Sequence, residues 1–187
     1  GCGAWFEPTG FLYEKFPPQI EAASLGLSPD GSVAVGRDLS RGRFEATRWT
    51  RAGGLIGMGD IPGSPTQNSF ASDASNTGVV VGTGAFGTPV QQAFRWTEAS
   101  GMVGLPGTTG GSGTAVSQDG NVITGYLISS NSREQHPFRW TADTGLTDLG
   151  LPSGFTSWAV AEDVSADGEV IVGEGGVAPF GLGAWRW

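Results

Sequence analysis

The chain of 187 residues is long enough for one domain with a proper core and too short for two comfortable ones. Its 33 Gly and 11 Pro make turns frequent, while seven Trp and ten Phe supply apolar surface that a disordered chain lacks. The net charge of −8 repels phosphate backbones and anionic lipids, which argues against nucleic-acid binding and membrane-surface roles. No apolar run is long enough to span a bilayer, so membrane insertion is not expected.

The N-terminal segment contains Cys2, the only cysteine, so no intrachain disulfide framework is expected. Cys2 is interpreted as a free thiol, with the remnant of a bacterial lipoprotein junction as the alternative. The stretch AWFEPTGFLYEKFPPQ that follows places Gly10 five residues after Trp5. The same spacing separates a tryptophan from a glycine later in the chain, in RWTADTG. We therefore interpret this segment as a partial copy of a repeat, with a strand near 11–16.

Two markers establish that repeat. The first marker is a four-residue turn that begins with Ser and ends with Gly, at Gly31, Gly78, Gly120 and Gly168. An Arg-Trp dipeptide also occurs four times, as Arg48-Trp49, Arg95-Trp96, Arg139-Trp140 and Arg186-Trp187. Both markers return after roughly 45 residues, a period typical of propellers and solenoids. We predict a single repeat domain over residues 1–187.

Each copy contains four short β-prone runs separated by turn signals. In the third copy TAVSQDG leads into NVITGYL, then into QHPFRWTADTG and LTDLGLPSG. The Asp-Gly step between apolar runs indicates a hairpin, because glycine accepts the positive φ of a tight turn. β-Branched and aromatic stretches suit a pleated surface. Four strands, a to d in chain order, are the signature of a propeller blade. The absence of apolar residues at helical spacing and the frequent Gly and Pro argue against a helical solenoid.

The chain closes with a c-type strand that ends at Trp187. We therefore predict an all-β, β-propeller-like fold of four four-stranded blades in which the N-terminal strand completes the last blade. Such closure would remove the open edges that invite aggregation. The alternative is a slice of a longer array.

The repeated Arg-Trp pairs are predicted to be structural. The tryptophans would pack between neighbouring blades, with a sugar-stacking platform as the alternative. Because side chains alternate along a strand, the arginines would point to the opposite face and reach a neighbouring carboxylate or backbone carbonyl. A ring of arginines gathering one anion is the alternative.

The acidic residues of the turns are interpreted in the same way. Asp30, Asp119 and Asp167 precede turn glycines and are expected to bond to nearby backbone groups. No cofactor or metal is expected. The calcium alternative rests on Asp163, Asp167 and Glu169, whose order does not match an EF-hand.

Catalytic constellations are sparse. His136 is the only histidine and precedes Pro137, so a loop role is expected. No nucleophile elbow and no histidine pair for zinc is present. A carbohydrate-active enzyme would use carboxylates such as Glu134, Asp163 and Glu174, and it is the weakest of the hypotheses.

The phrase FRWT…G…LP, followed by a Ser-rich Asp-Gly turn and an apolar strand, carries a resemblance. It stands in Phe94-Arg95-Trp96-Thr97, Phe138-Arg139-Trp140-Thr141 and Ser165-Ala166-Asp167-Gly168, with Val170-Ile171-Val172-Gly173 after the last. In these residues the chain resembles the HAF family of bacterial extracellular repeats. The first copy departs with Thr47 in place of Phe, and the last with Trp185. The resemblance implies a secreted or cell-surface location and supplies no catalytic residue.

The function predicted from the sequence is a non-enzymatic extracellular module for binding or structural display. Its partner would be a glycan or a surface protein, recognised through aromatic residues at Trp158, Trp185, Tyr126 and Phe155. The alternative is a self-assembling multimer or fibre that forms by strand exchange between chains.

Overall fold

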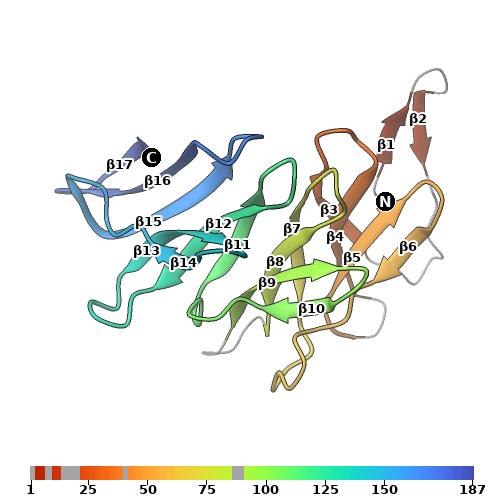
Figure 1. Cartoon of the computed structure of the whole chain (residues 1–187), viewed down its shortest axis with the longest axis horizontal. Coiled ribbons are helices and arrows are strands. Elements are labelled where there is room, and N and C mark those ends of the chain that lie inside the picture. The colour runs from red at the N-terminus through yellow and green to blue at the C-terminus, as the bar shows by residue number, and fades with distance from the viewer. Residues whose placement is uncertain (1–2, 7–9, 14–21, 40–41, 86–90) are drawn as a thin grey trace.

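The computed structural model describes residues 3–6, 10–13, 22–39, 42–85 and 91–187, and every regular element among them is a β-strand (Figure 1). This confirms the predicted all-β class. None of the described residues forms a helix long and apolar enough to cross a membrane.

The chain begins with a two-stranded antiparallel hairpin, β1 (Gly3–Phe6) with β2 (Gly10–Tyr13). Three four-stranded units follow, which we call blades 1, 2 and 3. Blade 1 contains β3 (Ala22–Leu27), β4 (Val33–Asp38), β5 (Glu45–Thr50) and β6 (Gly54–Gly57). Blade 2 contains β7 (Phe70–Ala74), β8 (Val80–Gly84), β9 (Gln92–Thr97) and β10 (Gly101–Gly104). Blade 3 contains β11 (Ser112–Val116), β12 (Val122–Ile128), β13 (Gln135–Thr141) and β14 (Gly145–Asp148).

Blade 4 contains three strands, β15 (Phe155–Val164), β16 (Ile171–Val177) and β17 (Gly181–Arg186). A single parallel pair, Gln135 with Trp158, joins it to blade 3. In all four blades the strands run in the predicted a, b, c order, and neighbours within a blade are antiparallel.

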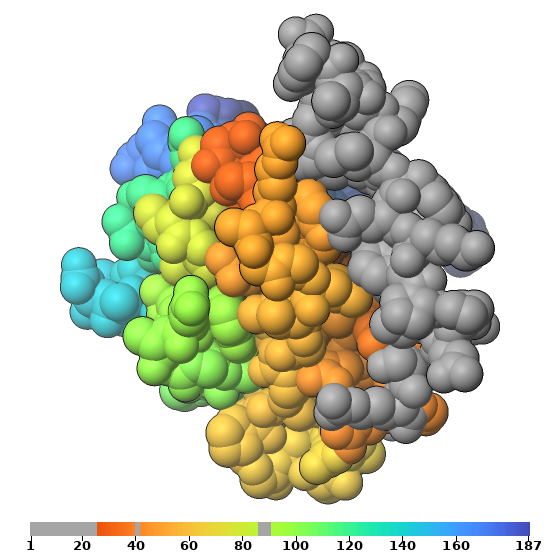
Figure 2. All heavy atoms as spheres, turned by 90° about the vertical axis from the view of Figure 1, so that its right-hand side faces the viewer, coloured from red at the N-terminus to blue at the C-terminus, as the bar shows by residue number. Residues whose placement is uncertain are grey.

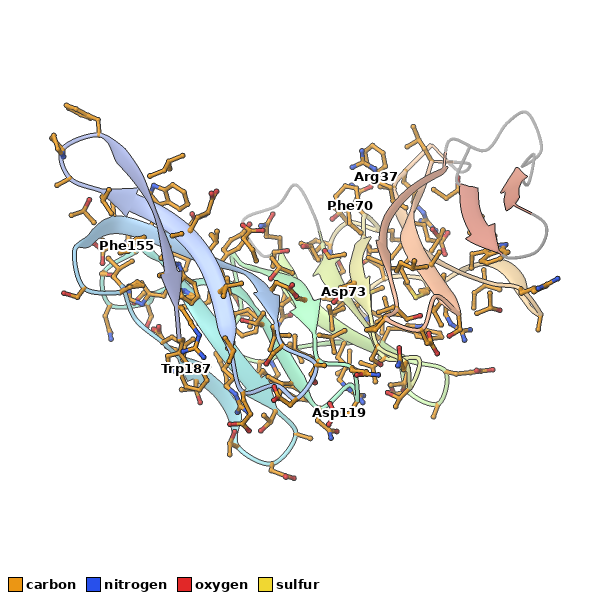
Figure 3. All side chains as sticks on the ribbon, turned by 90° about the horizontal axis from the view of Figure 1, so that it is seen from above. Arg37, Phe70, Asp73, Asp119, Phe155 and Trp187 are labelled. Carbon is orange, nitrogen blue, oxygen red and sulfur yellow. The ribbon has the colours of Figure 1, made fainter. Side chains whose placement is uncertain are left out.

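Closure of the last blade by the N-terminal strand is not what the structure shows. β2 pairs with β1, and β17 pairs with β16. The blades follow one another along the long axis, so that the hairpin and β17 lie at opposite ends of the molecule (Figures 1 and 3). The physical reason is local: β1 occupies the edge of β2 that β17 would need, and a hairpin closes a far shorter loop than a ring does.

A recurrent glycine explains how strand b lies so close to strand a. Gly82, Gly125 and Gly173 occupy the same position of strand b, each beside a bulge in strand a. A Cβ at any of them would overlap the backbone carbonyl oxygen of strand a, contributed by Phe70, Ser112 and Val160 respectively. The glycine that ends the Val-Val-Gly and Ile-Thr-Gly runs is therefore required by packing.

The core lies between the blades. One apolar cluster joins blades 1 and 2 around Val35, Val80 and Phe94, a second joins blades 2 and 3 around Val81 and Phe138, and a third joins blades 3 and 4 around Ala161 and Ile171. Each interface thus pairs one face of a blade with the opposite face of the next. Backbone bonds between successive a–b turns reinforce this stacking, from Asn76 N to Gln118 O (3.1 Å) and from Gln118 N to Ala166 O (3.2 Å).

Candidate functional site

The connection between blades 1 and 2 departs from the repeat. It spans residues 58–69, whereas the equivalent connections span only 105–111 and 149–154. Figures 1 and 2 show it as a gold segment that projects from the body of the molecule. Because binding groups are disproportionately carried by loops on a rigid scaffold, this insertion is the first place to look for a site.

A cavity of about 240 Å³ lies at this insertion. Its polar wall is formed by Arg43, Glu45, Asp60, Ser64 and Gln67, and the rest of the lining is Gly59, Ile61, Pro62 and Gly63. The volume is below the range typical of pockets for drug-sized ligands, so the cavity suits a small molecule or one unit of a chain.

The insertion is anchored to the c strand of blade 1. The Ser69 hydroxyl accepts from Ala46 N (3.0 Å) and donates to Gly59 O (2.7 Å), and Ser69 N donates to Phe44 O (3.0 Å). Glu45 Oε1 accepts from Gly59 N at 3.1 Å. These bonds hold the cavity wall in place at both ends of the loop.

Aromatic packing supports the same anchor. The rings of Phe44 and Phe70 lie 5.2 Å apart, and the guanidinium carbon of Arg37 is 4.9 Å from each ring centre. Figure 3 shows Arg37 beside Phe70. Contacts of a cation with two rings fix the start of β5, where Glu45 lies and which Arg43 precedes.

Asp60 links the insertion to blade 2. Its Oδ1 accepts from Ile61 N (2.8 Å) and from Ala85 N (3.2 Å). Ala85 is 3 % exposed and has a φ of 55°, in the left-handed region that non-glycine residues rarely adopt. Residues held in such conformations concentrate at functional sites, because the surrounding structure must compensate for their strain.

Two residues of the cavity lining each carry a buried polar atom that has no hydrogen-bond partner. Asp60 Oδ2 and Arg43 Nε are both buried and unpaired among the described residues. Burial raises the pKa of Asp60, while its backbone bonds and the Arg43 guanidinium act in the opposite direction. An unpaired buried polar atom destabilises a protein by about 1–3 kcal/mol, so its presence calls for an explanation.

The same strand-c position has a structural role in blades 2 and 3. Where blade 1 has Glu45, blade 2 has Gln92, whose Nε2 donates to Leu105 O at 2.7 Å. Blade 3 has His136, whose Nδ1 lies 2.9 Å from Asp148 Oδ1 and whose Nε2 lies 3.6 Å from Glu134. His136 therefore links strands c and d rather than standing alone in a loop.

The turn aspartates behave as predicted. Asp30, Asp119 and Asp167 each accept from the hydroxyl of the serine two residues before and from the backbone N–H two residues after. The hydroxyl bond is the largest cause that lowers the pKa of each carboxyl. Their local bonding is confirmed.

The metal alternative finds no support in the geometry. Asp163 Oδ1 accepts from Val164 N at 2.8 Å, and Asp167 Oδ1 accepts from Glu169 N at 3.1 Å. Among the residues that the structure describes, no three His, Cys, Asp or Glu side chains are grouped to hold a metal ion. Cys2 lies outside the described residues.

The proposed enzyme carboxylates are distributed over two blades. Glu134 lies beside His136 in blade 3, whereas Asp163 and Glu174 belong to blade 4. Burial, and secondarily the charge of Glu174, raises the pKa of Glu162.

The four aromatic candidates are half-buried rather than fully exposed. Trp185 packs in the apolar cluster between blades 3 and 4, and its Nε1 donates to Glu174 O at 3.1 Å. Phe155 and Trp158 lie over glycines of blade 4, including Gly175 and Gly176. Tyr126 is in blade 3. Ligand binding at these residues stays a prediction.

The Arg-Trp pairs form contacts between blades. Trp96 is 7 % exposed within the cluster of blades 1 and 2, and Trp140 packs against the next cluster, which confirms the packing role for both. The arginines point to the opposite face, as predicted, but two of them contact a ring rather than the expected carboxylate or carbonyl: the guanidinium carbons of Arg48 and Arg139 lie 5.7 and 5.9 Å from the ring centres of Trp96 and Trp187. An arginine of one blade thus faces the tryptophan of the next, because alternation along strand c points the two residues to opposite faces.

Comparison with solved structures shows the fold. TolB from Acinetobacter baumannii aligns with 89 % of this chain at a TM-score of 0.60 and 19 % identity, and the match covers 40 % of that chain. TolB from Agrobacterium tumefaciens aligns with 86 % of this chain, also at 0.60 and 19 %, and 59 % of that chain is covered. The chain is β-propeller-like. It spans about half the length of these two solved structures. No protein-family profile and no curated protein sequence matches it.

Sequence reasoning did not single out Arg43, Glu45 or Asp60. The available signal was the run MGDIPGSPTQNS, which is longer than the corresponding LPGTTGG and LGLPSG. In a repeat protein an insertion in one copy points to a function that the other copies lack.

Proposed function

We propose that this protein is a non-enzymatic binding module whose ligand is a small neutral polyhydroxylated group, such as one sugar unit of a glycan, held in the cavity beside Asp60. The observation that carries the proposal is that Asp60 and Arg43, whose Oδ2 and Nε atoms are buried and unpaired, both line one cavity. Of the three connections between blades that the structure describes, only the one that forms this cavity is lengthened.

The chemistry of the lining selects the class of ligand. A carboxylate oxygen only accepts hydrogen bonds and a guanidinium nitrogen only donates them. A hydroxyl group does both, so vicinal hydroxyls can satisfy Asp60 and Arg43 together. Bonds to charged partners contribute about 1.5–3 kcal/mol each, roughly twice the value for neutral pairs.

Charge disfavours other ligands. The chain carries a net charge of −8, and both Glu45 and Asp60 line the cavity, so an anionic ligand is opposed by more negative than positive charge. A fully apolar ligand would leave both polar atoms unpaired. A neutral hydroxylated group avoids both penalties.

A binding role fits the carboxylates better than catalysis. Glycoside hydrolysis uses two carboxyl groups that flank the scissile bond, one as acid and one as base or nucleophile. Here Glu45 Oε1 and Asp60 Oδ1 accept backbone N–H groups of the loop and of blade 2, so each carboxyl holds the cavity wall. The resemblance to secreted repeat proteins, together with the acidic surface, supports an extracellular or cell-surface location for such a module.

Calorimetric titration with glucose, galactose and N-acetylglucosamine, and with glucuronate as the anionic comparison, tests this proposal. Asp60→Asn keeps the Oδ1 acceptor for the loop and replaces the Oδ2 acceptor by an amide donor. We expect at least about a tenfold loss of affinity for the neutral sugar that binds, or about 1.4 kcal/mol.

Asp143→Asn is the matched control, because Asp143 is an exposed carboxylate in the c–d turn of blade 3 and lies outside the cavity lining. It removes the same charge and should leave the affinity unchanged. Binding that Asp60→Asn and Asp143→Asn weaken equally would contradict the proposal. The absence of any neutral-sugar binding would contradict it as well.

A further inference from the structure

His136 is held between two carboxylates at the junction of blades 3 and 4. Its Nδ1 lies 2.9 Å from Asp148 Oδ1 and 3.0 Å from Asp148 Oδ2, and its Nε2 lies 3.6 Å from Glu134 Oε2. The side chain is 13 % exposed, and Nε2 is buried without a hydrogen-bond partner among the described residues. The preceding residue, Gln135, forms the pair with Trp158 that joins the two blades. A change at the imidazole therefore acts where the blades meet.

The two contacts assign the protons of the ring. An ionised carboxylate only accepts hydrogen bonds, so the bond to Asp148 requires a proton on Nδ1. In the neutral imidazole Nε2 then carries the lone pair, and it faces the Glu134 carboxylate, so that two acceptors are turned toward each other. A second proton on Nε2 converts this repulsion into a charge-assisted hydrogen bond, which is about twice as strong as a neutral one.

The other ionisable groups of the surrounding segments lie away from the ring. Arg133 is exposed in the loop between strands b and c, which spans residues 129–134. Arg139 is three positions along β13, and Tyr126 of β12 is paired with the residue after His136, so both point to the opposite face of the sheet. β15 carries no ionisable side chain in its first seven residues, FTSWAVA. The charge around the imidazole is therefore set by the imidazole itself and the two carboxylates.

The equivalent position anchors the connection after strand d in each of blades 1 to 3. Glu45 in blade 1 and Gln92 in blade 2 bond directly to the backbone of that connection. In blade 3 His136 does so through Asp148, whose Oδ1 accepts from Gly150 N at 2.8 Å. Of the three side-chain types, only an imidazole ordinarily changes its charge between pH 5 and 8. The anchor of blade 3 is therefore the one suited to respond to pH in that range.

We propose that His136 is a pH-operated clamp, which on acidification takes up a proton at Nε2, draws the Glu134 carboxylate into hydrogen-bonding distance and ties the b–c loop of blade 3 to strand d. Glu134 O accepts from Ser129 N at 2.8 Å, so fixing Glu134 also fixes the start of the loop. Asp148 transmits the constraint to the connection with blade 4 through Gly150. The clamp is separate from the cavity between blades 1 and 2, so it does not depend on the proposed ligand.

A pH titration followed by nuclear magnetic resonance tests the proposal. His136 is the only histidine, so its ring signals are unambiguous in the nitrogen-15-labelled protein. We expect Nδ1 to carry the proton at pH 8. Between pH 8 and pH 5 we expect the amide signals of Ser129 and Glu134 to move along the same pH curve as the ring signals. Both results are read from the wild type, so they need no folded variant.

Glu134→Gln separates the clamp from the mere charge of the imidazole. The amide of Gln can donate to the neutral ring and accept from the protonated ring, so pairing no longer depends on pH. We expect the movement of the Ser129 amide signal to fall by at least half. Glu98→Gln is the matched control, because Glu98 is exposed in the c–d turn of blade 2 and its replacement removes the same charge. It should leave the movement unchanged.

A ring that carries its proton on Nε2 at pH 8, or loop amides that do not follow the ring, overturns the proposal. An undiminished movement of the Ser129 amide in Glu134→Gln, or an equal loss in Glu98→Gln, overturns it as well.

Discussion

Asp73 and Asp163 form a natural pair for testing whether the blades are joined by specific polar contacts. Both follow a bulge in strand a, and in both Oδ1 accepts from the next backbone N–H at 2.8 Å. Asp73 Oδ2 also accepts from Val116 N of blade 3, at 2.9 Å. Asp163 belongs to the end blade and is exposed. The two side chains therefore differ by one contact between blades.

The magnitudes follow from the groups left unpaired. Asp73→Ala removes the acceptor of two backbone N–H groups, those of the buried residues Ala74 and Val116. Each unpaired group lowers the free energy of unfolding by about 1–3 kcal/mol. Removal of a carboxylate whose burial raises its pKa offsets part of this loss. We expect a net loss of about 2–4 kcal/mol for Asp73→Ala, and about 0.5–1.5 kcal/mol for Asp163→Ala, which loses one local bond.

Urea unfolding at pH 7, followed by tryptophan fluorescence and circular dichroism, measures both free energies of unfolding. Equal losses in the two variants would refute the reasoning, since they would show that the Asp73–Val116 contact between blades contributes nothing. A larger loss for Asp163→Ala would refute it more strongly.

Three further predictions concern packing and pH. Gly125→Ala should destabilise the fold by about 1–3 kcal/mol, because its Cβ would overlap the Ser112 carbonyl; an unchanged melting temperature would contradict this. Burial raises the pKa of Asp73 in the folded state above its unfolded value, so the wild type loses stability as pH rises between the two values. The free energy of unfolding of Asp73→Asn, relative to that of the wild type, should therefore be higher at pH 7 than at pH 4 in urea titrations. The hydrogen bond from the Ser117 hydroxyl lowers the pKa of Asp119 in the folded state. The ionised carboxylate therefore stabilises the fold above its unfolded pKa, and this stabilisation is lost as pH falls through the folded pKa. Asp119→Asn should be destabilising at pH 7 and close to neutral at pH 2, and an effect that does not change with pH would contradict this.

The repeat made the strands and their local chemistry predictable. Turn aspartates such as Asp119 depend on contacts within a few residues, which the sequence displays directly. The packing role of Trp96 follows from a period that only stacked blades explain. The predicted partner of Arg48, a carboxylate or carbonyl, was wrong. The residue that Arg48 contacts, Trp96, belongs to the next copy, and the sequence does not show which residues of two copies meet.

Closure and the cavity depended on tertiary arrangement. Trp5 and Trp187 both carry the mark of a c-type strand, so the sequence left two possible partners for β2. The structure pairs β2 with β1, the partner that is near in sequence. The cavity joins Arg43 and Glu45 to a loop some fifteen residues later, and its unpaired atoms arise only once that loop is folded back. The length of the insertion was visible, but nothing in its composition specified which side chains would face the cavity.

The most direct test of the central claim is a map of ligand-induced amide shifts in the isotope-labelled protein, titrated with N-acetylglucosamine, glucose and galactose in turn. Blades 2 and 3 supply internal controls, since their shorter connections 105–111 and 149–154 have the same place in the repeat. We predict that a neutral sugar shifts the amides of residues 43–45 and 59–67, and that these shifts are lost in Asp60→Asn. Shifts centred on the other connections or on the aromatic residues of blade 4, or no shifts with any of the three sugars, would contradict it.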